Sequence, residues 1–382
     1  MIRLKHARLW DQYHSCDIRI TGDVVSSVTP VEEAAVTAVA GIEVQLNGAL
    51  AIPGFINSHD HLDFNCFPAL ANGIYPDYMA WGADIHERYE HRIGVVKRIP
   101  QELRIRWGLY KNLLHGFTTV VNHGEELSIP VDLVEVIQEG YILHSPGFEK
   151  NWKWKLNHPF RSDKPFVIHA GEGTSDAAAK ELDELARSNY LDHEIIVVHG
   201  VAMKATQAKH FRGLVWCPAS NFFLLGQTAH VQAIREEIPV VFGTDSTLSA
   251  SWDAWQHFRI AQLSGAADED ELMRMLTTIP AKLWGLKDRG ELAPGKKADL
   301  LVLDPVPGIF SRDAGSIRMV IRDGKIRMID DEMLKETEGF STKGYSRIRL
   351  HDRIKWVEGD IASLIRDLRK HDPEMEVPFQ YL

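Results

Sequence analysis

Between residues 52 and 290, short continuous apolar runs alternate with stretches of helical character. The clearest runs are Phe166–Ile168, Ile195–Val198, Leu214–Trp216 and Val240–Phe242, and a helical stretch such as Asp176–Asn189 lies between two of them. Continuous runs of this length are typical of parallel strands that are buried on both faces. Because parallel strands need long, usually helical, crossover connections, the alternation predicts an α/β fold with a parallel sheet.

The residues that end these runs help to choose between an open doubly wound sheet and a closed barrel. Nearly every run ends in a side chain that can bind a metal or move a proton: His59, His61, His123, His169, His199 and Asp245. A (β/α)8 TIM barrel gathers the carboxyl ends of its strands around one mouth, whereas an open sheet does not bring six of them together so readily. We therefore expect a metal-binding TIM barrel over residues 52–289, distorted around its third and fourth strands.

Strand-like segments with tight turns occupy both ends of the chain. The segments Asp17–Ile20 and Val24–Val28 flank a turn that contains Gly22, and a similar pattern returns at Asp299–Asp304. We expect residues 1–51 and 290–330 to form the two parts of one small β-sandwich domain. Residues 331–382 read as a charged C-terminal extension, with a helix over Arg349–Lys370 that covers or contacts another surface.

Composition restricts the partners. The formal net charge is -10 and no dense stripe of Lys and Arg occurs, which argues against nucleic acid and anionic membranes as partners. The first residues lack the apolar core of a signal peptide, no apolar run is long enough to span a bilayer, and three scattered cysteines do not make a disulfide framework. We expect a cytoplasmic protein with a small-molecule substrate, no nucleic-acid or membrane partner, and assembly into a homo-oligomer, a dimer.

His59 and His61 form the first candidate half-site. Alternate residues of a strand share a face, so both imidazoles point the same way and can bind a divalent transition metal. In a chain with 18 histidines, a lone His-x-His pair also arises by chance. The pair therefore carries weight only together with other candidates.

The other candidates follow later runs. His169 offers a third ligand, Glu172 a carboxylate that can move a proton, His199 a group that orients or polarises the substrate, and Asp245 a metal ligand or base. Each also has a structural explanation: a strand-end or core histidine, a solvated loop glutamate, or an aspartate that caps a helix. Their common position at the ends of successive runs favours a single site.

Three longer stretches resemble the amidohydrolase superfamily, particularly its cytosine-deaminase-like and ATZ/TRZ-like metal-dependent branches. Pro53–His61 is similar to the first barrel strand of that family, Gly116–His123 to its second, and Gly290–Leu300 to its return into the small β domain. The resemblance covers about residues 1 to 330.

The resemblance implies one divalent ion, Zn²⁺ with Fe²⁺ as the alternative, bound by His59, His61, His169 and Asp245. It also implies that Glu172 is the proton shuttle, that His199 helps to polarise the water or substrate, and that Asp245 doubles as the base. Two features depart from the family pattern. Tyr141–His144 reads as the third strand with no convincing fourth before Phe166, and no lysine ends a fourth strand, which favours a single ion over a lysine-bridged pair.

The resemblance predicts hydrolysis of a C–N bond, with deamination of an amino-substituted heterocycle as the favoured reaction. Hydrolysis of a cyclic or linear amide, as in imidazolonepropionase-like members, is the alternative, and a non-catalytic binding barrel is disfavoured because all six positions hold competent residues. Candidate substrate-binding residues are His123, Trp81, Trp154, Ser220 and Asn221, although loop or core packing explains the tryptophans equally well.

Overall fold

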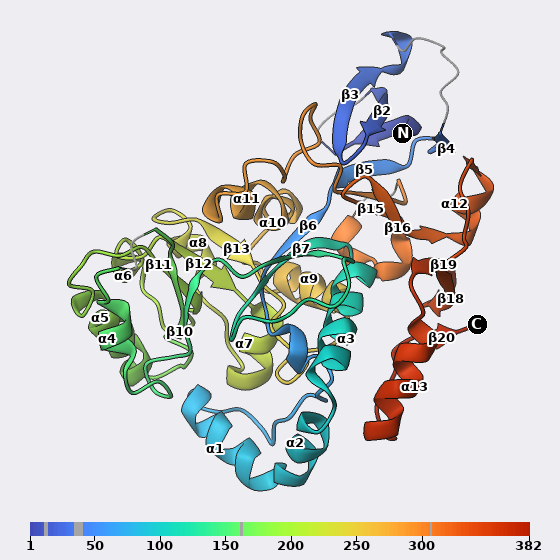
Figure 1. Cartoon of the computed structure of the whole chain (residues 1–382). Helices are drawn as coiled ribbons and strands as arrows, with labels where there is room; N and C mark the ends of the chain where they lie inside the picture. The colour runs from blue at the N-terminus through green and yellow to red at the C-terminus, as the bar shows by residue number, and fades with distance from the viewer. Residues whose placement is uncertain (11–13, 34–40, 161–162, 306–307) are drawn as a thin grey trace.

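The computed structural model describes residues 1–10, 14–33, 41–160, 163–305 and 308–382. Its central part contains eight strands, each parallel to its hydrogen-bonded neighbours, in two sheets (Figure 1). The first sheet has the order β6 (Phe55–Asp60), β7 (Phe117–Asn122) and β8 (Glu135–Ile137). The second has the order β13 (Val240–Phe242), β12 (Gly213–Trp216), β11 (Ile195–His199), β10 (Phe166–Ala170) and β9 (Tyr141–Leu143). The predicted parallel α/β arrangement is thus confirmed.

Helices connect most of these strands. The segment between β6 and β7 holds α1 (Tyr78–Arg88), α2 (Glu90–Lys97) and α3 (Gln101–Leu114), and short helices follow the next strands: α4 (Trp152–Leu156), α5 (Asp176–Arg187), α6 (Ala205–Ala208), α7 (Pro218–Leu225) and α8 (Val231–Ile234). After β13 come α9 (Ala254–Leu263), α10 (Glu269–Leu276) and α11 (Thr278–Leu283). In α5 the Ser175 side chain caps the helix, and Leu182 and Leu185 are buried, as the apolar spacing predicts. No helix among the described residues is both long and apolar enough to cross a membrane.

The connection between β8 and β9 is where the pattern breaks. Only Gln138, Glu139 and Gly140 separate the two strands, although β8 runs parallel to β7 and β9 runs parallel to β10. A helical crossover needs a dozen or more residues, so these two strands are successive pieces of one extended stretch that passes from one sheet to the other. The sequence analysis expected the irregularity between Tyr141 and Phe166, as a missing fourth strand. The structure places it before Tyr141, because β8 is an additional strand and Tyr141–Leu143 is therefore the fourth parallel strand in chain order.

The two parallel sheets approach each other again at β6 and β13. The backbone N–H groups of Thr244 and Asp245, just after β13, both donate to the carbonyl oxygen of His59, at 3.1 and 3.0 Å. By strand pairing alone, the described residues of the parallel region form two separate sheets, of three and five strands. The carboxyl ends of β6 and β13 therefore lie side by side, which brings the two ends of the central region together.

Strands from both ends of the chain form a third, mostly antiparallel sheet. Its order is β17 (Thr337–Glu338), β4 (Ile42–Gln45), β1 (Ile2–Leu9), β5 (Leu50–Pro53), β14 (Leu300–Leu303), β15 (Ile317–Arg322), β16 (Lys325–Asp330), β19 (Arg353–Glu358), β18 (Tyr345–Leu350) and β20 (Gln380–Tyr381), with β2 (Ser15–Thr21) on β1 and β3 (Val24–Pro30) on β2. Short helical turns lie at η1 (Val31–Glu33), η2 (Leu62–Phe64), η3 (Ile309–Ser311) and η4 (Ala314–Ser316). The sheet joins residues 1–51 with residues beyond 290 through the pairing of β5 with β14.

Alternation along the central strands of this sheet buries both of its faces. In β14, Leu300 and Val302 belong to the core of the sheet itself, whereas Leu301 and Leu303 pack with the core of the parallel region. Successive side chains of a strand point to opposite faces, so one strand serves both cores. This shared packing explains why β14 reads as a continuous apolar run.

The predicted helix over Arg349–Lys370 is wrong in its first half. Residues Tyr345–Leu350 and Arg353–Glu358 form the hairpin β18–β19, and only Ile361–His371 is helical (α13), beside α12 (Asp331–Lys335) of the same extension. The physical reason is visible in the alternation of Ile348 and Leu350, both buried, with exposed neighbours, a period of two that suits a strand. Figure 1 shows α13 running along the outside of the molecule beside α3.

Candidate metal centre and substrate pocket

Histidines from four strand ends meet in the centre of the parallel region. His59 and His169 are the last residues but one of β6 and β10, His123 follows β7, and His199 is the last residue of β11. Their rings are close: the centroids of His59 and His169 are 5.0 Å apart, and those of His123 and His169 are 4.2 Å apart. Residues separated by more than a hundred positions thus form one buried imidazole cluster.

The hydrogen-bond partners of His169 set its protonation. Its Nδ1–H donates to the carbonyl oxygen of His144 at 2.7 Å, because a carbonyl can only accept. The proton on Nδ1 leaves the Nε2 lone pair free, and that Nε2 lies 3.2 Å from Nε2 of His59. An imidazole held in this way by a backbone carbonyl is the usual form of a metal-ligating histidine.

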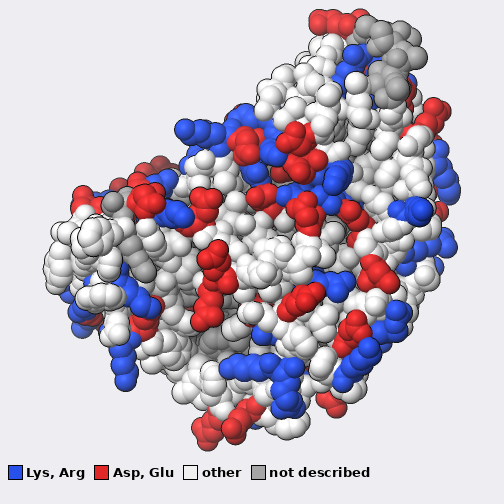
Figure 2. All heavy atoms as spheres, viewed as in Figure 1, with Lys and Arg blue, Asp and Glu red and all other residues white. Residues whose placement is uncertain are grey.

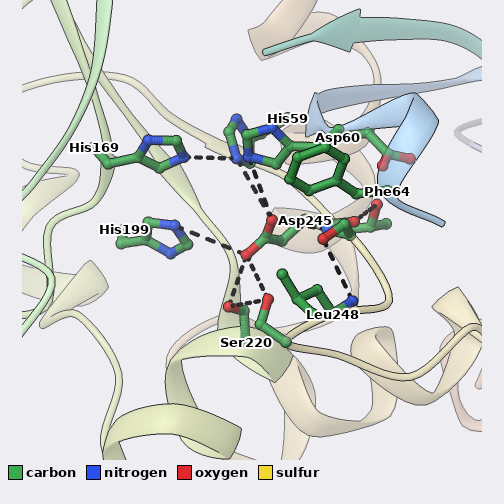
Figure 3. Close-up of polar contacts among 12 residues, drawn as sticks. His59, Asp60, Phe64, His169, His199, Ser220, Asp245 and Leu248 are labelled. Atoms are coloured by element: carbon green, nitrogen blue, oxygen red, sulfur yellow. Dashed lines mark hydrogen bonds and ion pairs between the residues drawn. The ribbon is translucent and has the colours of Figure 1, made fainter. Parts of the chain in front are cut away.

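Asp245 places a carboxylate among these rings. Its Oδ1 lies 3.8 Å from Nε2 of both His59 and His61, and its Oδ2 lies 3.9 Å from Nε2 of His199. Figure 3 shows the carboxylate between the imidazoles and the hydroxyl of Ser220. The backbone of Asp245 has φ of 57°, a left-handed conformation that aspartate tolerates better than most residues.

Two serines and one backbone amide orient this carboxylate. The hydroxyls of Ser220 and Ser249 donate to Oδ2 at 2.8 and 2.7 Å, and the N–H of Ser246 donates to Oδ1 at 2.7 Å. Burial alone would raise the pKa of Asp245, but attraction to His199, His61 and His169 outweighs it and lowers the pKa. The carboxylate is therefore held ionised, with its Oδ1 turned toward His59 and His61.

The donor set fits a divalent metal ion. The combinations His59, His123, His169 and His59, His199, Asp245 each offer ligand atoms within 4.8 Å of one another. Burial, followed by repulsion from the neighbouring imidazoles, keeps the pKa of His59, His123 and His169 well below the usual histidine value. Neutral imidazoles and an ionised carboxylate are the ligand forms that zinc and similar metals require.

Glu172 lies at the edge of this cluster. Its Oε1 is 3.7 Å from Nε2 of His199, and its backbone carbonyl accepts the N–H of Tyr78 at 3.1 Å, so the start of α1 packs directly on it. Burial, followed by repulsion from Asp245, raises the pKa of Glu172 well above the usual carboxyl value. A carboxyl group with a raised pKa can both accept and donate a proton near neutral pH.

His199 is oriented by Asn221. The Asn221 Oδ1 accepts a hydrogen bond from His199 Nδ1 at 2.9 Å, which places the ring proton on Nδ1 and leaves Nε2 free toward Glu172 and Asp245. The backbone of His199 is also left-handed, with φ of 70°. The ring is thus held with its free nitrogen toward the carboxylates.

A cavity of about 170 Å³ opens onto these residues, and its lining includes His61, His169, Glu172, His199 and Asp245. Its remaining wall is largely apolar and includes Phe64, Tyr78, Trp81, Ile85, Phe148 and Leu248. A larger cavity of about 670 Å³ lies elsewhere, between Leu9–Trp10 and residues of 270–293, and contains none of the predicted site residues. A flat, mostly apolar ring suits the smaller cavity.

The predicted substrate-binding residues divide into three groups. Trp81 lines the cavity, as expected. Trp154 does not: it lies on α4 with 69% of its surface exposed, because that short amphipathic helix turns the ring outward. Ser220, Asn221 and His123 are buried but do not line the cavity, since their side chains face Asp245, His199 and the imidazole cluster instead. Substrate binding by these three residues stays a prediction, and their observed contacts are with Asp245, His199 and the imidazole cluster.

The sequence analysis missed a buried ion pair behind the cluster. Lys111 of α3 and Asp60 of β6, 1% and 0% exposed, lie with Nζ 3.3 Å from Oδ2. Lys111 Nζ also donates to the carbonyl oxygen of Asp245 at 2.9 Å and to Oδ1 of Asn65 at 2.8 Å. The signal for it was the Lys111–Asn112 pair in the middle of an otherwise apolar helical stretch, where an unpaired charge would be costly.

Comparison with known proteins agrees with this geometry. Residues 150–327 match the amidohydrolase family. The chain is 26% identical to the 5-methylthioadenosine/S-adenosylhomocysteine deaminase of Halobacterium salinarum, over 76% of this chain and 84% of that protein. It is 25% identical to the protein of the same name from Pyrococcus horikoshii, over 84% and 93% of the two chains.

The fold is similar to that of an adenosine deaminase from Xanthomonas campestris whose crystal structure contains zinc. The TM-score is 0.72 at 16% identity, and the match covers 98% of both chains. At that identity the likeness concerns the fold. The match to the amidohydrolase family itself covers residues 150–327, a little under half of the chain.

Proposed function

We propose that this chain is a metal-dependent amidohydrolase that hydrolyses a C–N bond and deaminates an amino-substituted heterocycle. The observation that carries the proposal is the position of Glu172, a buried carboxyl of raised pKa, in the same cavity as His61, His169 and Asp245. The names of the Halobacterium and Pyrococcus relatives support an adenine-bearing thioether nucleoside as a first substrate to test.

The proposed ligands of one divalent ion are His59, His61, His169 and Asp245. We propose Zn²⁺, which binds three histidines and one carboxylate well and is present in the Xanthomonas structure, with Fe²⁺ as the alternative. When bound, such an ion lowers the pKa of a coordinated water to near neutrality. The position after β9 is held by His144, not lysine, which supports a single ion.

The protein residues then control the protons. Glu172 can take a proton and deliver it to the departing nitrogen, because its carboxyl faces the cavity and a raised pKa lets a carboxyl group both accept and donate a proton near neutral pH. His199 presents its free Nε2 to the same space and can polarise the group under attack. Asp245, held ionised by its serine partners, can act as the base. The apolar wall that includes Phe64 and Trp81 limits the access of bulk water.

We also propose that the eight strands β6–β13 close into a distorted (β/α)8 barrel over residues 52–289. The hydrogen bonds from Thr244 and Asp245 to His59 support closure between β13 and β6. The single stretch that holds β8 and β9 supports closure at the other seam, since three residues join strands that pair with β7 and β10. Residues 1–51 and 290–330 would form the small β domain, and its sheet also includes strands of the extension.

The test is the Glu172→Gln variant, assayed for ammonia release with 5-methylthioadenosine, S-adenosylhomocysteine, adenosine and cytosine, and for amine release with cyclic and linear amides. We expect the variant to lose turnover while its metal content per chain stays that of the wild type. The control is Glu181→Gln, a half-buried glutamate whose pKa burial raises to about 7. Its carboxylate accepts a hydrogen bond from the Tyr78 hydroxyl, and the residue does not line the cavity.

Each outcome distinguishes a different hypothesis. Ammonia release that depends on Glu172 supports deamination, and amine release from an amide supports the alternative hydrolysis. Full activity of Glu172→Gln would refute the proton shuttle. No turnover with any substrate class by the metal-loaded wild type would favour a binding protein.

A further inference from the structure

His123 has no hydrogen-bond partner although it is fully enclosed. The side chain follows β7, only 3% of the residue is exposed, and neither Nδ1 nor Nε2 contacts a donor or acceptor among the described residues. A neutral imidazole has one donor and one acceptor nitrogen, and leaving both unmet in a buried position costs free energy. A bound ligand would satisfy the nitrogens of the His123 imidazole.

The surroundings of His123 indicate which ligand. Its ring centroid is 4.9 Å from that of His59, 5.3 Å from that of His61 and 4.2 Å from that of His169. These are three of the four proposed metal ligands, and one nitrogen of His123 lies within 4.8 Å of nitrogens of both His59 and His169. Two nitrogens bound to one ion, each at about 2.1 Å, are at most about 4.2 Å apart. A small movement of the His123 ring would therefore bring its nitrogen within binding distance of an ion held by His59 and His169.

The backbone positions His123 for this role. Its N–H donates to the carbonyl oxygen of Asp60 at 2.8 Å, which aligns the end of β7 with the His59–His61 segment. His123 does not line the cavity, so its nitrogens are not available to a substrate there. The open side of the ring therefore faces the other imidazoles.

We propose that His123 is a further protein ligand of the divalent ion, so that four imidazoles and one carboxylate surround it. This inference rests on the proposed metal site and extends it. Zinc in proteins is almost always four-coordinate when all ligands come from the chain. A fifth protein ligand raises the coordination number, so this inference favours Fe²⁺, the alternative ion of the proposed site, over Zn²⁺.

The experiment is a titration of metal-free protein with Co²⁺, followed by visible absorption. The wild type is compared with His123→Leu, which removes both ring nitrogens but still fills the buried position with an apolar side chain. The control is His144→Leu: the His144 ring centroid is also near His169, at 5.6 Å, but its Nδ1 is paired with the Ser145 hydroxyl. Its backbone carbonyl, which His169 uses, is retained in the variant.

We expect the Kd for Co²⁺ to rise at least about tenfold in His123→Leu, since even outer partners of metal ligands change affinity about 10- to 100-fold. The visible bands should intensify as the coordination number falls toward four, and His144→Leu should match the wild type in both respects. Metal-free His123→Leu should unfold at the same temperature as the metal-free wild type or higher, because unsatisfied buried groups are removed.

Two results would overturn the inference. Wild-type Co²⁺ affinity and spectrum in His123→Leu would show that His123 is not a ligand, and a lower unfolding temperature of the metal-free variant would then assign it a packing role. Failure of the proposed metal site looks different, because the wild type itself would then bind no Co²⁺. Failure of the proposed reaction would leave Co²⁺ binding intact and abolish turnover only.

Discussion

The buried Lys111–Asp60 ion pair can be used to test how residues behind the imidazole cluster support the proposed metal centre. Both side chains are buried, and Asp60 stands between the two histidines of the first strand end. The Asp60 carboxylate also accepts from Asn65 and Asn112, each at 2.8 Å, so its lone pairs are occupied. Burial lowers the pKa of Lys111, and attraction to Asp60 opposes the shift. The charge is thus maintained by its partner.

The perturbation is Lys111→Met, which keeps the length of the side chain and removes the charge. Removal of one partner from a buried ion pair costs about 3 to 5 kcal/mol, because the other charge stays buried and uncompensated. The Asp245 carbonyl also loses its 2.9 Å bond to Nζ, although the Thr244 hydroxyl still donates to it at 3.0 Å. We therefore expect a loss of about 4 kcal/mol in unfolding free energy and about 10- to 100-fold weaker metal binding.

Urea unfolding of the metal-free protein measures the first effect, and Co²⁺ titration measures the second. The matched control is Lys355→Met in the small β sheet, where Lys355 (0% exposed) lies 3.9 Å from Asp330 and donates to the Gly315 carbonyl at 2.8 Å. That variant should lose less stability, because Asp330 keeps Arg353 at 3.3 Å and Arg318 at 3.4 Å, and it should keep wild-type metal affinity.

The double variant Lys111→Met/Asp60→Asn should recover part of the lost stability, since the uncompensated carboxylate is gone. Equal loss of metal affinity in Lys111→Met and Lys355→Met would refute the link between the ion pair and the centre. A stability loss below about 1 kcal/mol in Lys111→Met would refute the buried-charge argument itself.

Three further predictions concern pH, ligand support and the metal. Burial lowers the pKa of His257 to about 3, below the unfolded value near 6.5, so the unfolded chain binds the extra proton first as the pH falls. The free energy of unfolding should therefore fall by up to about 1.4 kcal/mol per pH unit between about pH 6 and 4. His257→Gln should reduce this slope in urea titrations, and an unchanged slope would contradict the prediction. Ser220→Ala removes one of two hydroxyl donors to Asp245, and Co²⁺ titration should show about tenfold weaker binding, whereas an unchanged Kd would assign the support to Ser249 alone. Removal of metal by a chelator should abolish turnover and lower the unfolding temperature, and Zn²⁺ should restore both; turnover that persists without metal would exclude the proposed chemistry.

Local patterns were enough to predict the parallel strands and most residues of the centre. A buried parallel strand is continuous in the sequence, so runs such as Ile195–Val198 can be recognised without any partner. The chemistry then follows from position, because residues at the carboxyl ends of neighbouring strands meet at one edge. His59, His169, His199 and Asp245 were all placed at strand ends in this way. The short strand β8 was missed, so the irregularity was expected before Phe166 although it lies before Tyr141.

Only the tertiary structure shows which side chains pack around the carboxyl ends of the parallel strands. The Lys111 ammonium contacts Thr244 and Asp245, which are more than 130 positions away, and no local pattern encodes such a contact. The direction of a buried side chain depends on neighbours from other elements, which is why Ser220 faces a carboxylate while Trp154 faces solvent. Strand periodicity brought the proposed ligands to one place, and long-range packing determined which side chains hold them there.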